Sequence, residues 1–394
     1  MSLAAMREWQ SVGMVLLGLV LIGAILWDAF ETMVLTRTVS RRWRFTGLFY
    51  FATRPAFYRM MRRRVGENRR HSLLSVYPPL SLFVLVACWA AALIMGFALL
   101  YDGLRIHLTQ ETETFGHYLY FSGTTFLTLG YGDLTPVEAI GRTLAVLESG
   151  TGFLFLALII SYLPVFYAAV QRREVMITML DSRAGSTPSG HELLRRHAEA
   201  GCLADLIPTL REYEKWGAEL LEAYLSYPVL SFYRSQHDDQ SWLLTATAIL
   251  DACALIEGGF EGEEPWSRSL RFQAHNTLAM LRHVLVDLAY ILKLEPDFRS
   301  GSRLTPEIEA WVREDLARAG LTLRSDADAR ERLVTTLALY EPYALGMGDE
   351  LLMPVPSFGR ADVLRDNWQI AAWDGHRHEE PGDQGNGEAA TRSR

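Results

Sequence analysis

Six consecutive residues, Thr128–Asp133 with the sequence TLGYGD, could bind an ion through their backbone. Glycine reaches backbone angles that are barred to other residues, so glycines at alternate positions let consecutive carbonyl groups point the same way. A row of such carbonyl oxygens can replace the water around a bare K⁺ ion. The pattern therefore predicts an ion selectivity filter. The side chains of Leu129 and Tyr131 would turn away from its axis, and the Thr128 hydroxyl would add an innermost ring of oxygens.

Three apolar runs are each long enough to cross a membrane as a helix, and they must position this motif. The first covers Ser11–Leu35, the second Leu80–Tyr101 and the third Gly141–Ala169. Between the second and the third, Phe115–Leu127 has the length of a short helix that enters the membrane partway. The negative end of its dipole would then favour a cation below the filter.

The motif closely resembles the TVGYGD signature of potassium-channel pore loops. The resemblance continues through Leu134–Pro136 and covers roughly Leu80–Arg173; a glycine turn in a soluble protein is the alternative. Because each chain has one such loop, four chains must surround one axis, so we expect a homotetramer. The resemblance implies no cofactor, with K⁺ as the permeant ion bound by the backbone carbonyls of Thr128, Leu129, Gly130 and Tyr131. Gly132 completes the expected filter.

The third apolar run should line the pore. Gly152 falls where related channels have a flexible glycine, so we expect a gating hinge there. Pro164 frees a backbone carbonyl and is expected to kink the helix. Four residues at helical spacing should share the face that forms the cavity wall, namely Phe153, Leu156, Ile160 and Pro164.

Four further residues are candidate supports of the filter. Thr124 stands where some members of the family have a glutamate that pairs with the aspartate after the filter, so Asp133 needs another partner. Tyr120 or a turret group could serve. Glu148 is a carboxylate inside a membrane-spanning run and is therefore a functional hypothesis by default. It could buttress the filter, concentrate cations or sit protonated; a hydrogen-bonded structural acid is the alternative.

The connection between the first two runs is rich in arginine over residues 37–70, which places it in the cytoplasm by the positive-inside rule. An outward-facing filter then requires an exterior N-terminus and a cytoplasmic C-terminal domain, in a multi-pass protein of the cell membrane. Arginines mixed with aromatic residues are typical of a helix in the headgroup plane, so we expect contact with anionic lipid. A topology signal without lipid specificity is the alternative. The position between membrane spans argues against nucleic-acid binding.

We interpret the chain as an all-α membrane protein: three transmembrane helices plus a re-entrant pore helix and selectivity filter, followed by an all-helical cytosolic domain. The expected regions are an N-terminal transmembrane helix (1–36), a basic cytoplasmic or interfacial segment (37–79), the pore domain (80–173), a helical regulatory domain (174–375) and a disordered tail (376–394). Apolar residues near the helical period predict cytosolic helices at Gly190–Ala200, Leu203–Tyr227, Gln240–Glu257, Ser267–Leu294, Thr305–Ala319 and Asp326–Met353.

No motif identifies what the cytosolic domain senses. The sequence has no GxGxxG after a strand, and the acidic stretch Glu257–Glu264 lacks the spacing of an EF-hand. It presents no catalytic constellation, so we expect no enzyme activity. The predicted function is passive K⁺ transport through a tetrameric pore gated via the cytosolic domain, whose ligand is unknown. A receptor or scaffold with a weakly conducting pore, and a poorly selective cation channel, remain open alternatives.

Overall fold

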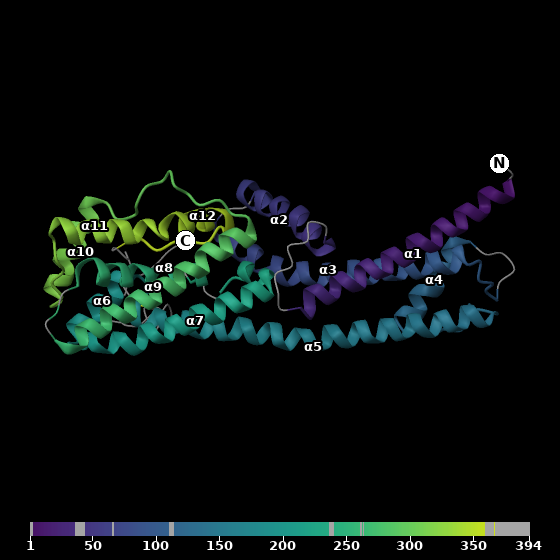
Figure 1. Cartoon of the computed structure of the whole chain (residues 1–394), viewed down its shortest axis with the longest axis horizontal. Helices are drawn as coiled ribbons and strands as arrows, with labels where there is room; N and C mark the ends of the chain where they lie inside the picture. Colours follow the sequence, from purple (N-terminus) through teal and green to yellow (C-terminus); the bar gives the residue numbers. More distant parts are fainter. Residues whose placement is uncertain are drawn as a thin grey trace, which may run out of the picture.

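The computed structural model describes residues 3–35, 44–64, 67–109, 114–235, 240–260, 262, 264–358 and 366. The tail predicted for 376–394 and part of the arginine-rich segment lie outside these residues. The described chain is elongated, with long apolar helices at one end and a bundle of shorter helices at the other (Figure 1). Its only β pairing within these ranges consists of isolated bridges, which confirms the all-α fold class.

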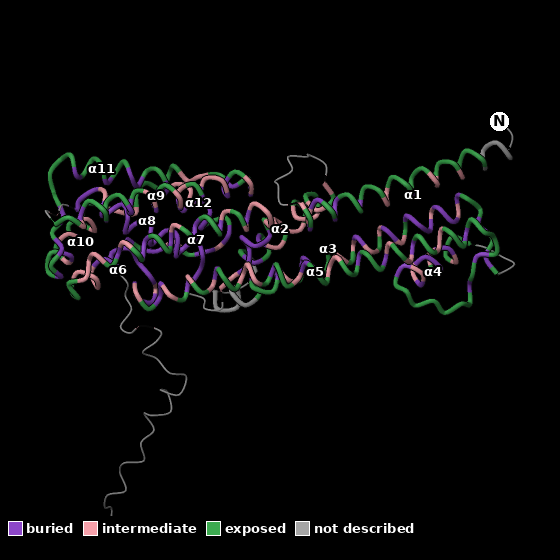
Figure 2. Tube along the Cα trace, turned by 60° about the horizontal axis from the view of Figure 1, so that its bottom comes forward, coloured by how far each residue is buried: buried purple, intermediate pink, exposed green. Residues whose placement is uncertain are grey.

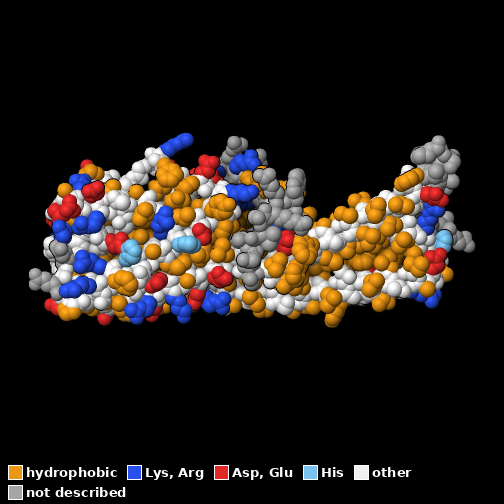
Figure 3. All heavy atoms as spheres, viewed as in Figure 1, with side chains coloured by type: hydrophobic (Ala, Val, Ile, Leu, Met, Phe, Trp, Pro, Cys, Tyr) orange, Lys and Arg blue, Asp and Glu red, His pale blue; other side chains and the backbone are white. Residues whose placement is uncertain are grey.

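Three long helices build one end of the molecule: α1 (Leu3–Met33), α3 (Glu67–Gly103) and α5 (Ala139–Ala184). Each contains a stretch long and apolar enough to cross a membrane, as the three runs predicted. Hydrophobic side chains cover the surface of this end (Figure 3), and many residues there are exposed (Figure 2). Such a surface is stable against lipid and costly in water, so this end is the membrane part.

Helices α1 and α3 pack closely because glycines face each other. A Cβ added at Gly18 would lie 2.7 Å from the carbonyl oxygen of Gly96, and a Cβ at Gly96 would lie 2.7 Å from Ile22. Small residues let helix backbones approach in lipid, where van der Waals packing is the main attraction between helices. The first apolar run is therefore part of the pore unit's packing.

Helix α5 joins the two ends of the molecule. It has 46 residues, which corresponds to about 69 Å at 1.5 Å per residue. Pro164 lies inside it without ending it, and the helix continues past the expected domain boundary after Arg173 to Ala184. The membrane part and the bundle are thus connected by one continuous helix.

The bundle is built around α8 (Trp242–Gly259), in which every residue except Glu257 is buried. This helix is apolar enough to qualify as a membrane span, but other helices surround it. They are α6 (Gly190–Glu199), α7 (Leu206–Ser226), α9 (Pro265–Leu292), α10 (Pro306–Arg318), α11 (Ala327–Ala338) and α12 (Glu341–Leu351), with 3₁₀ turns η1 (Leu203–Asp205) and η2 (Pro228–Phe232).

Five of the six predicted cytosolic helices are present with closely similar bounds, but the sixth prediction was wrong in one respect. The expected helix Asp326–Met353 is two helices, α11 and α12, which separate at Leu339 and Tyr340. Pro342 explains the break, because a proline inside a helix removes a backbone hydrogen bond and clashes with the preceding turn.

A buried ionic network holds the loop before α10 against α8 and α12. Arg303 binds both carboxylate oxygens of Asp251, at 2.6 and 3.0 Å, and its Nε lies 3.0 Å from Glu341. The Tyr340 hydroxyl also donates to Asp251. Burial alone would lower the pKa of Arg303, but the charge and hydrogen bonds of Asp251 outweigh it, so the pKa is raised and the guanidinium stays charged.

Replacing Arg303 by Ala should destabilise the bundle, because two buried carboxylates would lose their cation. Breaking a buried pair in this way typically costs about 3–5 kcal/mol in the free energy of unfolding. Urea unfolding of the full chain, followed by tryptophan fluorescence, measures the change. Arg299→Ala, an exposed arginine on the same loop, is the matched control. Equal unfolding midpoints for the two variants would contradict this assignment.

Candidate functional site

The backbone of the predicted filter alternates between two conformations. The short helix α4 (Phe115–Phe126) ends just before it, and Thr128, Gly130 and Gly132 then have φ angles of +55°, +57° and +78°. Leu129 and Tyr131, which lie between them, have no positive φ. A Cβ on either glycine would meet nothing within 4 Å, so it is the backbone conformation and not crowding that requires glycine.

Thr128 is a strained member of this loop, because β-branched residues rarely adopt the left-handed conformation. The carbonyl end of α4 holds this loop in place through three hydrogen bonds. The Thr124 carbonyl oxygen accepts hydrogen bonds from the amides of Leu129 (2.8 Å) and Gly130 (3.3 Å), and the Thr125 carbonyl accepts one from Thr128 (3.1 Å). Strain of this kind is kept where the surrounding structure over-determines it, often at functional sites.

The carbonyl groups of this segment are unused. No backbone or side-chain hydrogen bond among the described residues reaches the carbonyl oxygens of Thr128–Gly132. All five residues are exposed in the single chain, so these oxygens are not covered by its other described residues. The loop therefore offers oxygen atoms that are available to an ion.

Asp133, directly after the glycines, is bound by the residue that the sequence offered as one candidate. The Tyr120 hydroxyl of α4 donates to its carboxylate at 3.0 Å. From the segment between α3 and α4, the Thr109 hydroxyl donates to the Asp133 carbonyl at 3.3 Å. Thr124 supports the loop through its backbone carbonyl, while its hydroxyl donates within α4 to the Phe121 carbonyl at 2.9 Å.

Glu148 lies on α5 and is fully buried. Its carboxyl group meets the Tyr101 hydroxyl of α3 at 2.8 Å and the Ser122 hydroxyl of α4. Glu148 thus joins α5 to both α3 and α4, behind the end of α4 that leads into the loop. The sequence analysis named neither partner of Glu148. Ser122 could have been noticed because it is a polar residue inside the short apolar helix.

Gly152, the predicted hinge, lies against α4. A Cβ at this position would be only 2.0 Å from the carbonyl oxygen of Phe126, the last residue of α4. Helix α5 is continuous here. A close approach of two backbones therefore requires glycine at this position, whether or not the helix also bends there. Gly150, one half-turn away, has nothing within 4 Å of its added Cβ.

The predicted cavity wall lies on a face of α5 that the chain leaves uncovered. Phe153, Leu156 and Ile160 are 65%, 54% and 63% exposed, and Pro164 is exposed as well. The side chains of Leu129 and Tyr131 are also more than half exposed, at 53% and 69%. The described part of the chain thus leaves both side chains largely uncovered.

Below this region the bundle encloses α5, a contact that the sequence did not predict. Phe166 is fully buried, and its ring lies 5.1 Å from that of Tyr233 and 6.4 Å from that of Tyr227, which flank η2. Two turns further along α5, Arg173 donates from Nη1 to the Tyr224 hydroxyl and the Leu230 carbonyl, each at 3.1 Å. Arg173 is itself buried in the bundle.

A further helix, α2 (Phe45–Arg64), connects the arginine-rich segment to the bundle. Arg54 lies 5.4 Å from the ring of Phe232 and donates to the Leu292 carbonyl, while Arg62 pairs with Asp349 at 3.2 Å. These two arginines have protein partners. Arg44 has protein partners too, because its Nε lies 3.3 Å from Glu31 and 3.8 Å from Asp28. The expected lipid contact therefore stays a prediction for the remaining arginines of 37–70.

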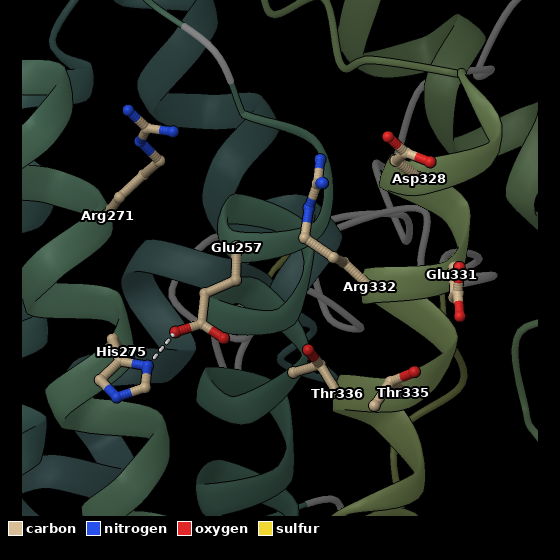
Figure 4. Close-up of a pocket in the computed structure, with 8 residues that line it drawn as sticks. All are labelled: Glu257, Arg271, His275, Asp328, Glu331, Arg332, Thr335 and Thr336. Atoms are coloured by element: carbon tan, nitrogen blue, oxygen red, sulfur yellow. Dashed lines mark hydrogen bonds and ion pairs between the residues drawn. The ribbon is translucent and has the colours of Figure 1, made fainter.

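The bundle also has an open cleft of about 620 Å³ between α8, α9 and α11 (Figure 4). His275 and Glu257 form a pair across it at 2.8 Å. The described residues give no carboxylate partner to Arg271 or Arg332, which also line it. Within the described ranges no group of three or more His, Cys, Asp or Glu side chains could hold a metal ion.

Comparison with known proteins points to the same part of the chain. A family model described as "Ion channel" matches residues 81–168, which contain the end of α3, α4, the loop and most of the membrane part of α5. The uncharacterized membrane protein YdjJ of Bacillus subtilis (strain 168) is 25% identical over 200 residues, 50% of this chain and 57% of that protein. No solved structure shows significant similarity to the chain.

Two shorter relatives match with higher identity. Protein LctB of Geobacillus stearothermophilus is 36% identical and that of Bacillus caldotenax is 32% identical, each over 93 residues, or 21% of this chain and 68% of the relative. The chain spans little more than half the length of YdjJ. With its matching sequence and its arrangement of α3, α4 and α5, the chain is a helical membrane protein that belongs to the ion-channel family.

Proposed function

We propose that the protein is a K⁺-selective channel that carries the ion passively across the membrane. The observation that carries this proposal is the row of unpaired carbonyls at Thr128–Gly132, with left-handed residues at every second position. Oxygen ligands with no other partner can replace the hydration shell of K⁺. The filter residues are Thr128, Leu129, Gly130, Tyr131 and Gly132.

Four chains would surround one axis and complete the site. One loop presents oxygens to only one side of an ion, so a ring needs copies related by rotation. The exposed side chains of Leu129 and Tyr131 fit this arrangement, because a neighbouring subunit could cover them. The uncovered face of α5 with Phe153, Leu156 and Ile160 would then line the cavity.

The proposed orientation has the N-terminus outside and the bundle in the cytoplasm, and the regions 80–173 and 174–375 act as pore and regulator. The contacts of Phe166 and Arg173 support regulation through α5, because any movement of η2 would pull on the pore-lining helix.

The proposed site for the cytosolic ligand is the cleft that Arg271 lines. Contact of the remaining arginines of 37–70 with anionic lipid is part of the same proposal.

Flux through reconstituted protein separates this function from its alternatives. A K⁺ channel passes K⁺ far better than Na⁺, a poorly selective cation channel passes both, and a receptor or scaffold with a weakly conducting pore passes little of either. Gly130→Val should abolish K⁺ flux in liposomes, because a side chain at φ +57° is strained by roughly 1–2 kcal/mol and displaces the carbonyl row.

The matched control is Gly116→Val in the first turn of α4, an exposed position whose added Cβ meets its nearest atom at 3.6 Å. We expect K⁺ flux and the K⁺/Na⁺ ratio to stay near those of the unchanged protein. Undiminished K⁺ flux through the Gly130 variant would overturn the assignment of the filter.

Gly152→Ala tests the contact between α5 and α4. The added methyl group would push against the Phe126 carbonyl at a typical cost of roughly 1–3 kcal/mol, so thermal stability of the assembly and K⁺ selectivity should both fall. Gly150→Ala is the control, because it adds the same group to open space and gains helix propensity. If Gly152 acted only as a hinge, its variant would change gating and leave stability intact.

Arg173→Ala tests the link between bundle and pore. Loss of its contacts with Tyr224 and Leu230 should shift the open probability by roughly 2–30-fold, the range that coupling residues typically show, without changing unitary conductance. Its neighbour Arg172 is exposed, so Arg172→Ala should leave the open probability unchanged. Single-channel recording in planar bilayers measures both quantities. Identical behaviour of the two variants would argue against transmission through this contact.

A further inference from the structure

The carboxyl group of Glu148 lies in a continuous chain of three hydrogen-bond contacts, two of which it makes itself. The Tyr101 hydroxyl lies 2.8 Å from one carboxyl oxygen, and the Ser122 hydroxyl contacts the other. The same Ser122 oxygen lies 2.8 Å from the carbonyl oxygen of Ile94 on α3. The chain therefore runs from α3 through α5 to α4 and back to α3.

Counting protons shows which form of the acid this chain accommodates. A serine hydroxyl has one hydrogen to donate, and a backbone carbonyl has none. If Glu148 were ionised, Tyr101 and Ser122 would supply two hydrogens for three contacts, and one pair of oxygens would face each other without a hydrogen. If Glu148 is a neutral acid, each of the three contacts has one hydrogen.

The surroundings favour the same form. Glu148 is fully buried, and no Lys, Arg or His of the described residues lies within ion-pair distance of it. An isolated buried carboxylate is very costly, and within a membrane such a group normally pairs or neutralises. Here two hydroxyl groups are the available partners, and neither brings a positive charge.

We propose that Glu148 is a neutral carboxylic acid that donates its proton to the Ser122 oxygen, while Ser122 donates to Ile94 and Tyr101 donates to Glu148. The acid is a positioning residue: it fixes Ser122, and with it α4, against both flanking helices. Its consequence for ion selectivity rests on the proposed function, because α4 holds the filter through the Thr124 carbonyl. The hydrogen-bond chain itself does not depend on that function.

Glu148→Gln reproduces the hydrogen-bond pattern of the neutral acid, since its amide nitrogen donates to Ser122 and its oxygen accepts from Tyr101. Glu148→Ala removes both contacts. We expect the Gln variant to keep thermal stability, K⁺ flux and the K⁺/Na⁺ ratio close to those of the unchanged full-length protein. The Ala variant should lose flux or selectivity by about tenfold, as expected for a lost buried hydrogen bond.

Infrared difference spectroscopy of the full chain in lipid at neutral pH reads the protonation state directly. The unchanged protein should show the carbonyl band of a protonated carboxyl group, which Glu148→Gln removes and Tyr101→Phe shifts. Glu138→Gln, an exposed acid at the start of α5, is the control and should leave the band in place.

Absence of the band, or a Gln variant as damaged as the Ala variant in thermal stability, would overturn the neutral acid. If the unchanged protein passes no K⁺, the proposed function fails, while the infrared band and the stability of the variants still decide the state of Glu148. If the band is present but the Ala variant keeps full K⁺/Na⁺ selectivity, the acid is neutral and the positioning role is wrong.

Discussion

The carbonyl end of α4 is the point on which the pore loop depends. A left-handed threonine and two left-handed glycines form a strained segment that uses its amides and leaves its carbonyls unpaired. The Thr124 carbonyl takes two of those amides, so the direction of the carbonyl row follows the position of α4. Two contacts from α5 set that position: the backbone of Gly152 lies against Phe126, and Glu148 binds Ser122.

Helix α5 therefore has two sets of contacts with different partners. In the membrane part it presses on α4, and beyond Pro164 the aromatic rings around Phe166 and the bonds of Arg173 enclose it in the bundle. One continuous helix thus carries both sets of contacts. The same physical connection explains why no separate linker is needed between pore and bundle.

Much of this arrangement could be predicted from local patterns. Apolar runs predict the membrane helices because a bilayer demands about 20 apolar residues per span, and apolar residues at the helical period predict the helices of the bundle. Helix α8 shows the limit of composition, since it is as apolar as a membrane span but forms the centre of the bundle. Composition reports that a helix avoids water and does not report whether lipid or protein replaces it.

The sequence by itself determined the alternation of the backbone at Thr128–Gly132, the number of membrane helices and the helical nature of the bundle, because these follow from backbone sterics and from the spacing of apolar residues along one segment. Only the tertiary structure decided which residues serve each site. Tyr120 rather than another group binds Asp133, Tyr101 and Ser122 meet Glu148, and Arg173 enters the bundle. Each of these contacts joins residues from different elements, and their distance depends on how whole helices pack, which no local pattern encodes.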